Sequence, residues 1–386
     1  MKKIIYTDNN ATTMIAPEVF DAMKPFLTER YGNPSSMYTF GGSIHKDVEE
    51  ARGKVAHLLG ASDLSEIMFT SCGTESDNAA IIGTLRTYPE KKHIITTKAE
   101  HAAVLNLCQY METEGYRVTY LGINEEGMID INELKSSIDT DTALISIMYA
   151  NNETGVIFPV EEIAEIARQR NVVFHTDAVQ AAGKIPMNMT KFPADMVSIS
   201  GHKIHAPKGV GALYIRRGTK FKPFMIGGHQ EHSRRGGTEN VASIVGLGRA
   251  AELAEEHFDD EIKRVRELRD KLEKSLLEKI PNTRLNGSKD KRLPNTTNIG
   301  FEFIEGEAIL LMMDAENIAA SSGSACTSGS LAPSHVLRSM GIPFTFIQGS
   351  IRFSLSRYNT EKDIDHIIKC LAPIIEKLRK ISPYGN

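Results

Sequence analysis

The sequence predicts an α/β protein with a layered, mostly parallel sheet, joined to a smaller α+β domain. Over the first two thirds of the 386 residues, short β-branched runs alternate with amphipathic helical patterns, and this alternation is typical of a parallel sheet covered by helices. A strongly charged helical pattern over 255–279 and a turn-rich stretch over 281–298 then replace the alternation. The change indicates a second domain, joined through the charged helix.

Seven strands are expected in the first region, because each run has the length and composition of a strand. They are 66–70, 93–97, 117–122, 142–150, 172–177, 195–200 and 209–216. Between them, 43–59 has the apolar face of a helix, and Pro159 opens another helix at its first turn. The second region is expected to contain a strand at 297–303, a helix at 305–316, a strand at 350–356 and a terminal helix.

Composition and charge exclude several classes of protein. Hydrophobic residues make up 41% and charged residues 24%, as in ordinary globular chains, and 45 Lys+Arg against 49 Asp+Glu give a net charge of −4. We therefore expect neither a nucleic-acid partner nor a membrane partner. No apolar stretch approaches the ~18 residues of a membrane span, and the N-terminus lacks the apolar core of a secretory signal, so a cytoplasmic location is expected.

The four cysteines, Cys72, Cys108, Cys326 and Cys370, lie far apart, with no CxxC motif and no Cys/His cluster. Neither a disulfide framework nor a structural zinc site is expected. Cys326 differs from the other three because it lies in SSGSACTSGS, whose small residues favour a mobile loop. Composition alone slightly favours a flexible linker there, but an exposed thiol is an oxidation liability unless it has a function. The other cysteines are interpreted as core or neutral residues.

Polar side chains follow two predicted strands at the edge where ligands collect in open α/β sheets. Asp177 ends one strand and Gln180 follows three residues later, whereas Ser200, His202 and Lys203 stand at the end of another. Taken singly, Asp177 is more often a turn or cap residue, and His202 a surface histidine. Their shared position makes them candidates for one binding site.

Thr74 lies where a predicted strand gives way to a helix, GTESDNAAIIGTL. The free backbone N–H groups and the positive dipole end of such a helix can bind a phosphate. The alternative is a capping box with Asp77, which is the better interpretation of these two residues taken alone.

A set of motifs occurs in order along the chain: YTDNNATT, YGNPSS, SCGTESDN, AEHAAV, MYANNETG, HTDAVQ, SGHKIHAPKG, RRGGTEN, SSGSACTSGS and IRFSLSRYN. Together they closely resemble the NifS/IscS cysteine desulfurases, group I enzymes of the class V pyridoxal-phosphate aminotransferase family. The resemblance spans residues 5–360, and GGHQEHSRRGGTEN and FSLSRYNT are more similar to the NifS branch. Two positions depart from the usual pattern. Cys72 stands where a small residue is common; it is interpreted either as a small buried residue or as an auxiliary thiol. Gly236 stands where serine or alanine is common.

The resemblance implies a pyridoxal-phosphate transferase of fold type I, similar to aspartate aminotransferase. A large cofactor-binding domain, 15–257, would contain a mostly parallel seven-stranded sheet. A small α+β domain, 1–14 with 258–386, would carry the catalytic cysteine loop at about 320–334. The resemblance also implies a homodimer with shared active sites, in which Thr238 reaches the phosphate of the neighbouring subunit's cofactor.

The same resemblance assigns residues to the cofactor, pyridoxal 5′-phosphate. Lys203 would form the internal aldimine and later shuttle a proton, and His101 would stack on the ring. Asp177 would pair with the pyridinium nitrogen and keep it protonated, which makes the ring an electron sink. Gln180 would form a hydrogen bond with the ring 3′ oxygen. The remaining cofactor contacts would come from Gly73, Thr74, Asn152, Ser200 and His202.

Asn152 and Arg352 would fix the substrate L-cysteine, because a guanidinium fork suits its α-carboxylate. The alternative for Arg352 is a strand residue paired at the surface. With Lys203 and His101, Cys326 would form the catalytic set: its thiolate would attack the substrate sulfur and leave L-alanine and a persulfide on Cys326. A NifU/IscU-like scaffold would accept the sulfur for iron–sulfur cluster assembly. No resident metal is expected; the one metal contact left open is a transient one between Cys326 and a partner's iron–sulfur cluster.

Other functions remain open on the sequence alone. A selenocysteine lyase or an aminotransferase-like enzyme fits the same fold, but an aminotransferase would not need Cys326. A binding or scaffold protein without catalysis is less compatible with the intact set of catalytic residues. A zinc hydrolase built on His202 and His205 is set aside, because no third ligand is suitably spaced.

Overall fold

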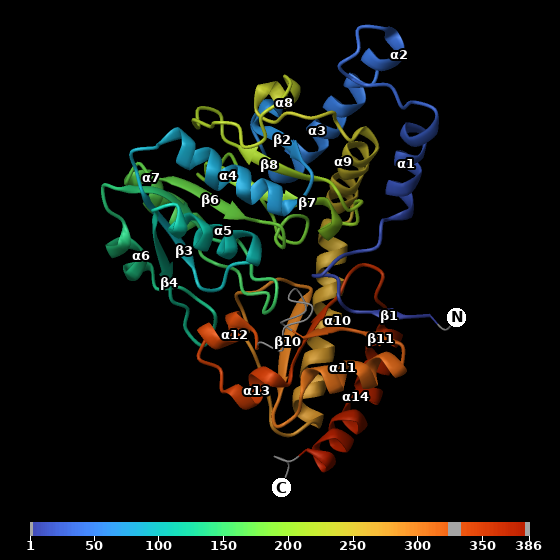
Figure 1. The fold of residues 1–386 in the computed structure, drawn as a ribbon. Helices are drawn as coiled ribbons and strands as arrows, with labels where there is room; N and C mark the ends of the chain where they lie inside the picture. The colour runs from blue at the N-terminus through green and yellow to red at the C-terminus, as the bar shows by residue number, and fades with distance from the viewer. Residues whose placement is uncertain (1–2, 323–332, 383–386) are drawn as a thin grey trace.

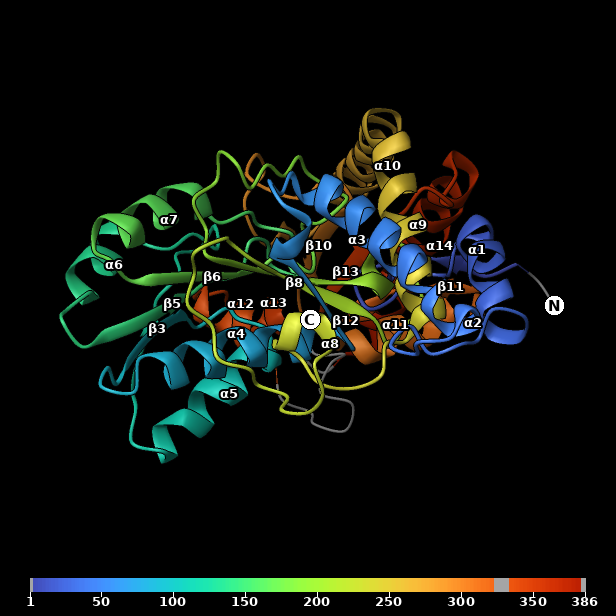
Figure 2. The same cartoon turned by 90° about the horizontal axis from the view of Figure 1, so that it is seen from above.

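The computed structural model describes residues 3–322 and 333–382. Its larger part is a seven-stranded sheet with helices on both faces (Figures 1 and 2). In spatial order the strands are β2 (Ile67–Thr70), β8 (Gly211–Ile215), β7 (Met196–Ser200), β6 (Val173–Asp177), β5 (Thr142–Ser146), β3 (His93–Thr97) and β4 (Arg117–Leu121). Only β8 pairs antiparallel with its neighbours in this sheet. The predicted α/β fold with seven mostly parallel strands is confirmed.

Most strands of this sheet bury side chains on both faces, as β2 illustrates. Ile67 and Phe69 join the largest apolar core, whereas Met68 between them joins a cluster on the opposite face. Successive side chains of a strand point to opposite faces of the sheet. When helices cover both faces, the sequence of the strand is therefore a continuous apolar run. Figure 2 shows the helices of the two layers on opposite sides of the strands: α4 (Gly73–Thr87) and α5 (Ala102–Thr113) on one side, α3 (His45–Leu59), α7 (Val160–Gln169) and α9 (Val241–Glu256) on the other.

The smaller part contains a four-stranded antiparallel sheet packed against three helices. Its strands are, in spatial order, β12 (Ser321–Ser322), β13 (Ser350–Ser354), β10 (Thr296–Phe301) and β9 (Thr283–Leu285). The helices are α10 (Phe258–Lys279), α11 (Gly306–Ala315) and α14 (Glu361–Ile381). Figure 1 shows α10 running from the large layer into this part. Near the N-terminus, β1 (Ile5–Tyr6) pairs in parallel with β11 (Ile318–Ala319) in a separate two-stranded sheet. Asp8 then bridges Ser354 of β13, so the start of the chain lies against the small sheet.

Two separate apolar cores support the predicted pair of domains, whose division at 257/258 remains a prediction. One core belongs to the large sheet, and the other is built almost wholly from the small sheet and its helices. Two short helices of the C-terminal region, α12 (His335–Ser339) and α13 (Phe344–Gln348), contribute Val336, Leu337 and Ile347 to the large core instead. The described region from residue 333 onward therefore packs against both parts.

The remaining short helices are α1 (Pro17–Thr28), α2 (Thr39–Gly42), α6 (Ile131–Ser137) and α8 (Gln230–Ser233). Most predicted boundaries differ from the structure by one or two residues, as at α3, which begins at His45 instead of residue 43. The strand expected over 142–150 ends four residues early, at Ser146. The charged helix expected from residue 255 is broken at His257, whose backbone is not helical (φ −109°, ψ 8°). The first two residues of the predicted helix therefore belong to the end of α9.

Within the described ranges, no helix combines the length and apolar character that a bilayer crossing requires.

Candidate active site

The carboxyl ends of the parallel strands meet at one cavity of about 240 Å³. One water occupies roughly 30 Å³, so the cavity can hold a small organic molecule. The strands place the residues that follow them at this edge, which is where open α/β sheets bind ligands. Nine of the residues singled out from the sequence line it: Gly73, Thr74, His101, Asn152, Asp177, Gln180, Ser200, His202 and Lys203.

Lys203 is held by the N-terminal segment of the chain. It ends a 3₁₀ turn that follows β7, and its Nζ donates to the carbonyl oxygens of Asn10 at 2.6 Å and Ala11 at 2.7 Å. The amide of Asn10 in turn donates to the carbonyl of Asn152 at 3.1 Å. The amine is therefore aimed into the cavity by a segment that precedes it by nearly two hundred residues.

Asp177 and His101 both line the cavity. Asp177 is buried at the end of β6 and accepts the N–H of Val179 at 2.9 Å. Burial raises the pKa of Asp177, while His101 and Lys203 oppose that rise. His101 is the N-cap of α5, where its Nδ1 accepts the N–H of Ala103 at 3.1 Å, and burial lowers its pKa. The histidine therefore lines the cavity as a neutral ring of fixed orientation.

Gln180 has its amide oriented by a half-buried lysine. Gln180 Nε2 donates to the Asn10 carbonyl at 3.0 Å, and Lys184 Nζ donates to Gln180 Oε1 at 3.0 Å. Burial, followed by the positive charge of Lys203, lowers the pKa of Lys184 from 10.5 to about 7. The sequence analysis did not single out Lys184 or Asn10.

The N-terminus of α4 can accept an anion. Its N-cap is Cys72, whose side chain makes no capping bond, so the capping box proposed for Thr74 and Asp77 is wrong. The first N–H groups of a helix have no partner within it. A Cβ on Gly73 would lie 2.8 Å from a methyl carbon of Val179, so this turn needs glycine. The backbone thus approaches the cavity closely, with its donors and the positive dipole end facing it.

The hydroxyl of Ser200 shows that this edge of the cavity suits a phosphate. Its Oγ is buried and has no hydrogen-bond partner among the described residues. Such a group costs free energy unless a ligand satisfies it, and a phosphate at the start of α4 would do so. Burial is the main cause that lowers the pKa of His202 to about 4, so this side chain is a neutral donor or acceptor at the same edge. The residues fit the phosphate of pyridoxal phosphate.

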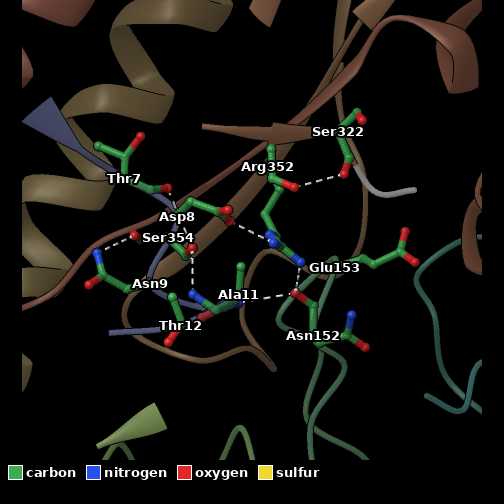
Figure 3. Close-up of polar contacts among 12 residues, drawn as sticks. Thr7, Asp8, Asn9, Ala11, Thr12, Asn152, Glu153, Ser322, Arg352 and Ser354 are labelled. Atoms are coloured by element: carbon green, nitrogen blue, oxygen red, sulfur yellow. Dashed lines mark hydrogen bonds and ion pairs between the residues drawn. The ribbon is translucent and has the colours of Figure 1, made fainter. Parts of the chain in front are cut away.

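Arg352 lies beside this cavity and is fully buried, with 1% of its surface exposed, so the alternative of a surface-paired strand residue is wrong. In Figure 3 its guanidinium points from β13 toward Asp8 and Asn152. Nη2 lies 2.7 Å from Asp8 Oδ1, and Nη1 donates to the Asn152 carbonyl at 3.0 Å. Arg352 Nε is buried and has no partner among the described residues. Arg352 thus retains capacity for a further carboxylate next to the cavity.

Two predicted residues are not placed at the cavity. Cys326 lies in 323–332, outside the described residues. Thr238 is exposed and does not line the cavity of its own chain. The described residues that flank the cysteine segment do lie near Arg352: Ser321 pairs with Arg352 along β13, and Ser334 Oγ donates to Glu153 Oε2 at 2.5 Å.

Both departures from the family pattern have a structural setting. Cys72 is half-buried and lines the cavity, so the interpretation as a small buried residue is wrong. Gly236 packs on Gly227: a Cβ at Gly236 would lie 2.5 Å from the Gly227 Cα. Serine or alanine at position 236 therefore requires a different path of the facing backbone.

The expectation that the chain has no Cys/His cluster is wrong. His366 and Cys370 lie one helical turn apart on α14, and Glu316 reaches them from the end of α11. A His-x₃-Cys spacing within a predicted helix was the available signal, because residues four apart share one face. Glu316, fifty residues away, could not be added from the sequence.

Similar proteins show the family to which the chain belongs. The aminotransferase class-V family matches residues 5–367. A cysteine desulfurase of Trichormus azollae is 61% identical over 99% of this chain and 96% of its own length, and the cysteine desulfurase NifS of Azotobacter vinelandii is 54% identical over 99% and 95%. A solved NifS-like protein superposes with a TM-score of 0.91 at 39% identity, covering 98% of this chain and 100% of its own. The chain therefore belongs to the aminotransferase class-V family, within the group of cysteine desulfurases that includes NifS.

Proposed function

We propose that the protein is a pyridoxal-phosphate-dependent cysteine desulfurase that converts L-cysteine to L-alanine and keeps the sulfur as a persulfide on Cys326. One observation carries the proposal. An amine, Lys203, a buried acid, Asp177, and an uncapped helix N-terminus converge on one cavity, with the buried cation of Arg352 beside it. The names of the relatives over nearly the whole chain support the same activity.

The chain's own residues would hold the cofactor in a fixed orientation. The start of α4 with Ser200 and His202 would bind the phosphate, Asp177 the ring nitrogen, and Gln180 the ring oxygen. His101 would cover the ring face, since its ring is oriented by the α5 backbone. When bound, pyridoxal phosphate supplies an electron sink for charge that develops at the substrate α-carbon.

Arg352 would bind the substrate carboxylate in competition with Asp8. A buried guanidinium needs an anionic partner, and Asp8 supplies it in this structure. The α-carboxylate of L-cysteine would join or replace Asp8 at the guanidinium, and the Asn152 carbonyl would keep Arg352 in place. The negative charge of Asp8 therefore opposes substrate binding while it stabilises the empty site.

Lys203 and Cys326 would act on the bound amino acid in turn. Lys203 would remove the α-proton, and the carbonyls of Asn10 and Ala11 would hold the ammonium that results. The Cys326 thiolate then attacks the substrate sulfur: an S–S bond forms, the C–S bond breaks, and its electron pair remains with the carbon fragment. Two protons return to that fragment at the α and β carbons, which gives L-alanine. L-cysteine and one thiol thus become L-alanine and one persulfide, with no external oxidant or reductant.

A homodimer with shared active sites belongs to the proposal. Large apolar side chains are exposed on and after α1, and such surfaces favour association: Phe20, Leu27, Tyr31, Met37 and Tyr38. Thr238 is exposed outside the cavity of its own chain, where a neighbouring subunit could receive it. Arg235 pairs with Glu75 in the first turn of α4 and thereby fixes the segment that carries Thr238.

Sulfur delivery to a NifU/IscU-like scaffold for iron–sulfur cluster assembly completes the proposal. It rests on the names of the relatives and on the exposed persulfide carrier that the sequence predicts. A reducing, cytoplasmic compartment suits the enzyme, because Cys72, Cys108 and Cys370 are free thiols.

An assay of L-cysteine with alanine quantified tests the activity. Wild type should release one alanine per sulfur transferred to a thiol acceptor. Cys326→Ala should retain the absorbance of the bound cofactor and bind L-cysteine without releasing alanine. An aminotransferase-like enzyme would keep full turnover in Cys326→Ala, and that result would overturn the desulfurase assignment.

A further inference from the structure

Three side chains of metal-ligating type meet where α14 passes the carboxyl end of α11. His366 and Cys370 lie one turn apart on α14, and Glu316 is the residue at which α11 ends. Their ligand atoms all lie within 4.8 Å of one another. None of the three lines the cavity that contains Lys203.

The spacing of these atoms suits a tetrahedral ion. The Cys370 sulfur lies 3.9 Å from His366 Nδ1 and 4.0 Å from Glu316 Oε2. With Zn–S near 2.3 Å and Zn–N or Zn–O near 2.0–2.1 Å, neighbouring ligand atoms of a tetrahedral site are about 3.5 Å apart. His366 and Cys370 are half-buried and fixed to one helix, whereas Glu316 is exposed. A rotation of the Glu316 side chain is therefore enough to close the ligand set.

The charges around the cluster favour a cation. His366 Nε2 lies 3.3 Å from the Glu316 carbonyl and can donate to it while Nδ1 binds an ion; this carbonyl stands at the carboxyl end of α11, where the helix dipole is negative. A bound dication would offset the carboxylate and a thiolate together.

We propose that Glu316, His366 and Cys370 form a zinc site with three protein ligands and a water at the fourth position. Thiolate and imidazole ligands select zinc over magnesium or calcium, which take oxygen ligands. Binding releases the thiol proton, because the thiolate is the ligand. The ion joins α11 to α14, so it stabilises the small domain and does not depend on the proposed desulfurase activity.

Competition for zinc against a chromophoric chelator tests the site in the full-length holoenzyme. A Cys72→Ala/Cys326→Ala background removes every cysteine outside the cluster except the buried Cys108, and it should bind one zinc per chain. In that background, Cys370→Ala and His366→Ala should each weaken binding at least tenfold, and Glu316→Gln by a smaller factor. His57→Ala, at an exposed histidine remote from the cluster, should leave binding unchanged.

Thermal melting provides a second measurement that separates lost ligands from lost folding. Zinc should raise the melting temperature of the background protein, and a chelator should reverse the shift. Cys370→Ala should melt like the zinc-free background with or without zinc. The proposal is overturned if the background binds no zinc, or if its zinc equivalent survives Cys370→Ala.

Discussion

Asp8 and Arg352, which are 344 positions apart in the chain, form an ion pair of 2.7 Å beside the cavity. The Arg352 side chain is 2% exposed and that of Asp8 18%, so solvent screens the pair only weakly. The cation best placed for a substrate carboxylate therefore already holds a carboxylate of the protein. Breaking a buried pair by removing one partner leaves an uncompensated charge, so Asp8 shapes both stability and affinity.

Asp8→Asn should lower the KM for L-cysteine several-fold and leave kcat within about twofold. Asparagine keeps an oxygen that accepts from Arg352 Nη2, but the negative charge that repels the substrate carboxylate is gone. The ligand-free variant should melt at a lower temperature, because Arg352 loses its anionic partner. Steady-state kinetics and thermal melting check both effects, with Asp314→Asn at an exposed acid as the control. An unchanged or higher KM would show that Asp8 orients Arg352 rather than competing for it.

Lys184→Met should remove a pH-dependent cost of folding. The native pKa of Lys184 is about 7 and its ordinary value is 10.5, so between these pH values the unfolded chain binds more protons than the native chain. The wild type therefore gains stability as the pH rises through this window, by up to about 1.4 kcal/mol per pH unit, and carries the full cost below pH 7.

Methionine carries no proton, so the melting temperature of Lys184→Met minus that of wild type should be largest near pH 6 and should shrink by pH 9.5. The lost bond to Gln180 contributes equally at all pH values and cancels from this comparison. A difference that does not vary with pH would contradict the neutral state assigned to the buried amine.

Ser334→Ala should slow persulfide formation without changing the KM for L-cysteine. Ser334 caps α12 by accepting the Leu337 N–H at 3.1 Å, and it donates to Glu153, whose pKa burial raises to about 7. Loss of the cap and of the bond to a buried carboxyl should destabilise the protein by roughly 1–3 kcal/mol. Ser334 follows the cysteine segment closely, so rapid-quench kinetics should show a lower rate of label transfer. Ser339→Ala, which loses only a bond to a helix carbonyl, should behave as wild type.

Hybrid dimers should recover activity if Thr238 serves the neighbouring subunit. Lys203→Ala homodimers should be inactive, and Thr238→Val homodimers should bind the cofactor more weakly. A hybrid of the two has one site with both substitutions and one site with neither. Mixing and re-pairing the subunits should therefore give about half the wild-type activity per hybrid at limiting cofactor. No recovery in verified hybrids would place Thr238 in the site of its own chain.

Local sequence patterns were sufficient for the sheet and for the residues at its edge. All seven strands and the positions of Asp177, Ser200 and Lys203 follow from runs of a few residues and from the rule that ligands gather at strand ends. The pattern overextended the strand at 142–150, because buried residues after Ser146 stay apolar without pairing as a strand.

The partners of these residues could not be predicted, because they come from distant segments. Asp8 meets Arg352 and the carbonyl of Asn10 meets Lys203 only after the N-terminal segment crosses from the small sheet to the cavity. The YTDNNATT motif marked that segment, but its side-chain roles have no local signature. The same holds for Glu316, which joins His366 through tertiary packing.

A single turnover with sulfur-labelled L-cysteine, followed by mass mapping of the cysteine peptides, tests the central claim most directly. The account predicts one labelled sulfur on Cys326 in the wild type and none in Lys203→Ala, because the amine must act before the thiolate can take the sulfur. Label on Cys72 instead, or on Cys326 in Lys203→Ala, would contradict the joint action of these two residues on one bound substrate.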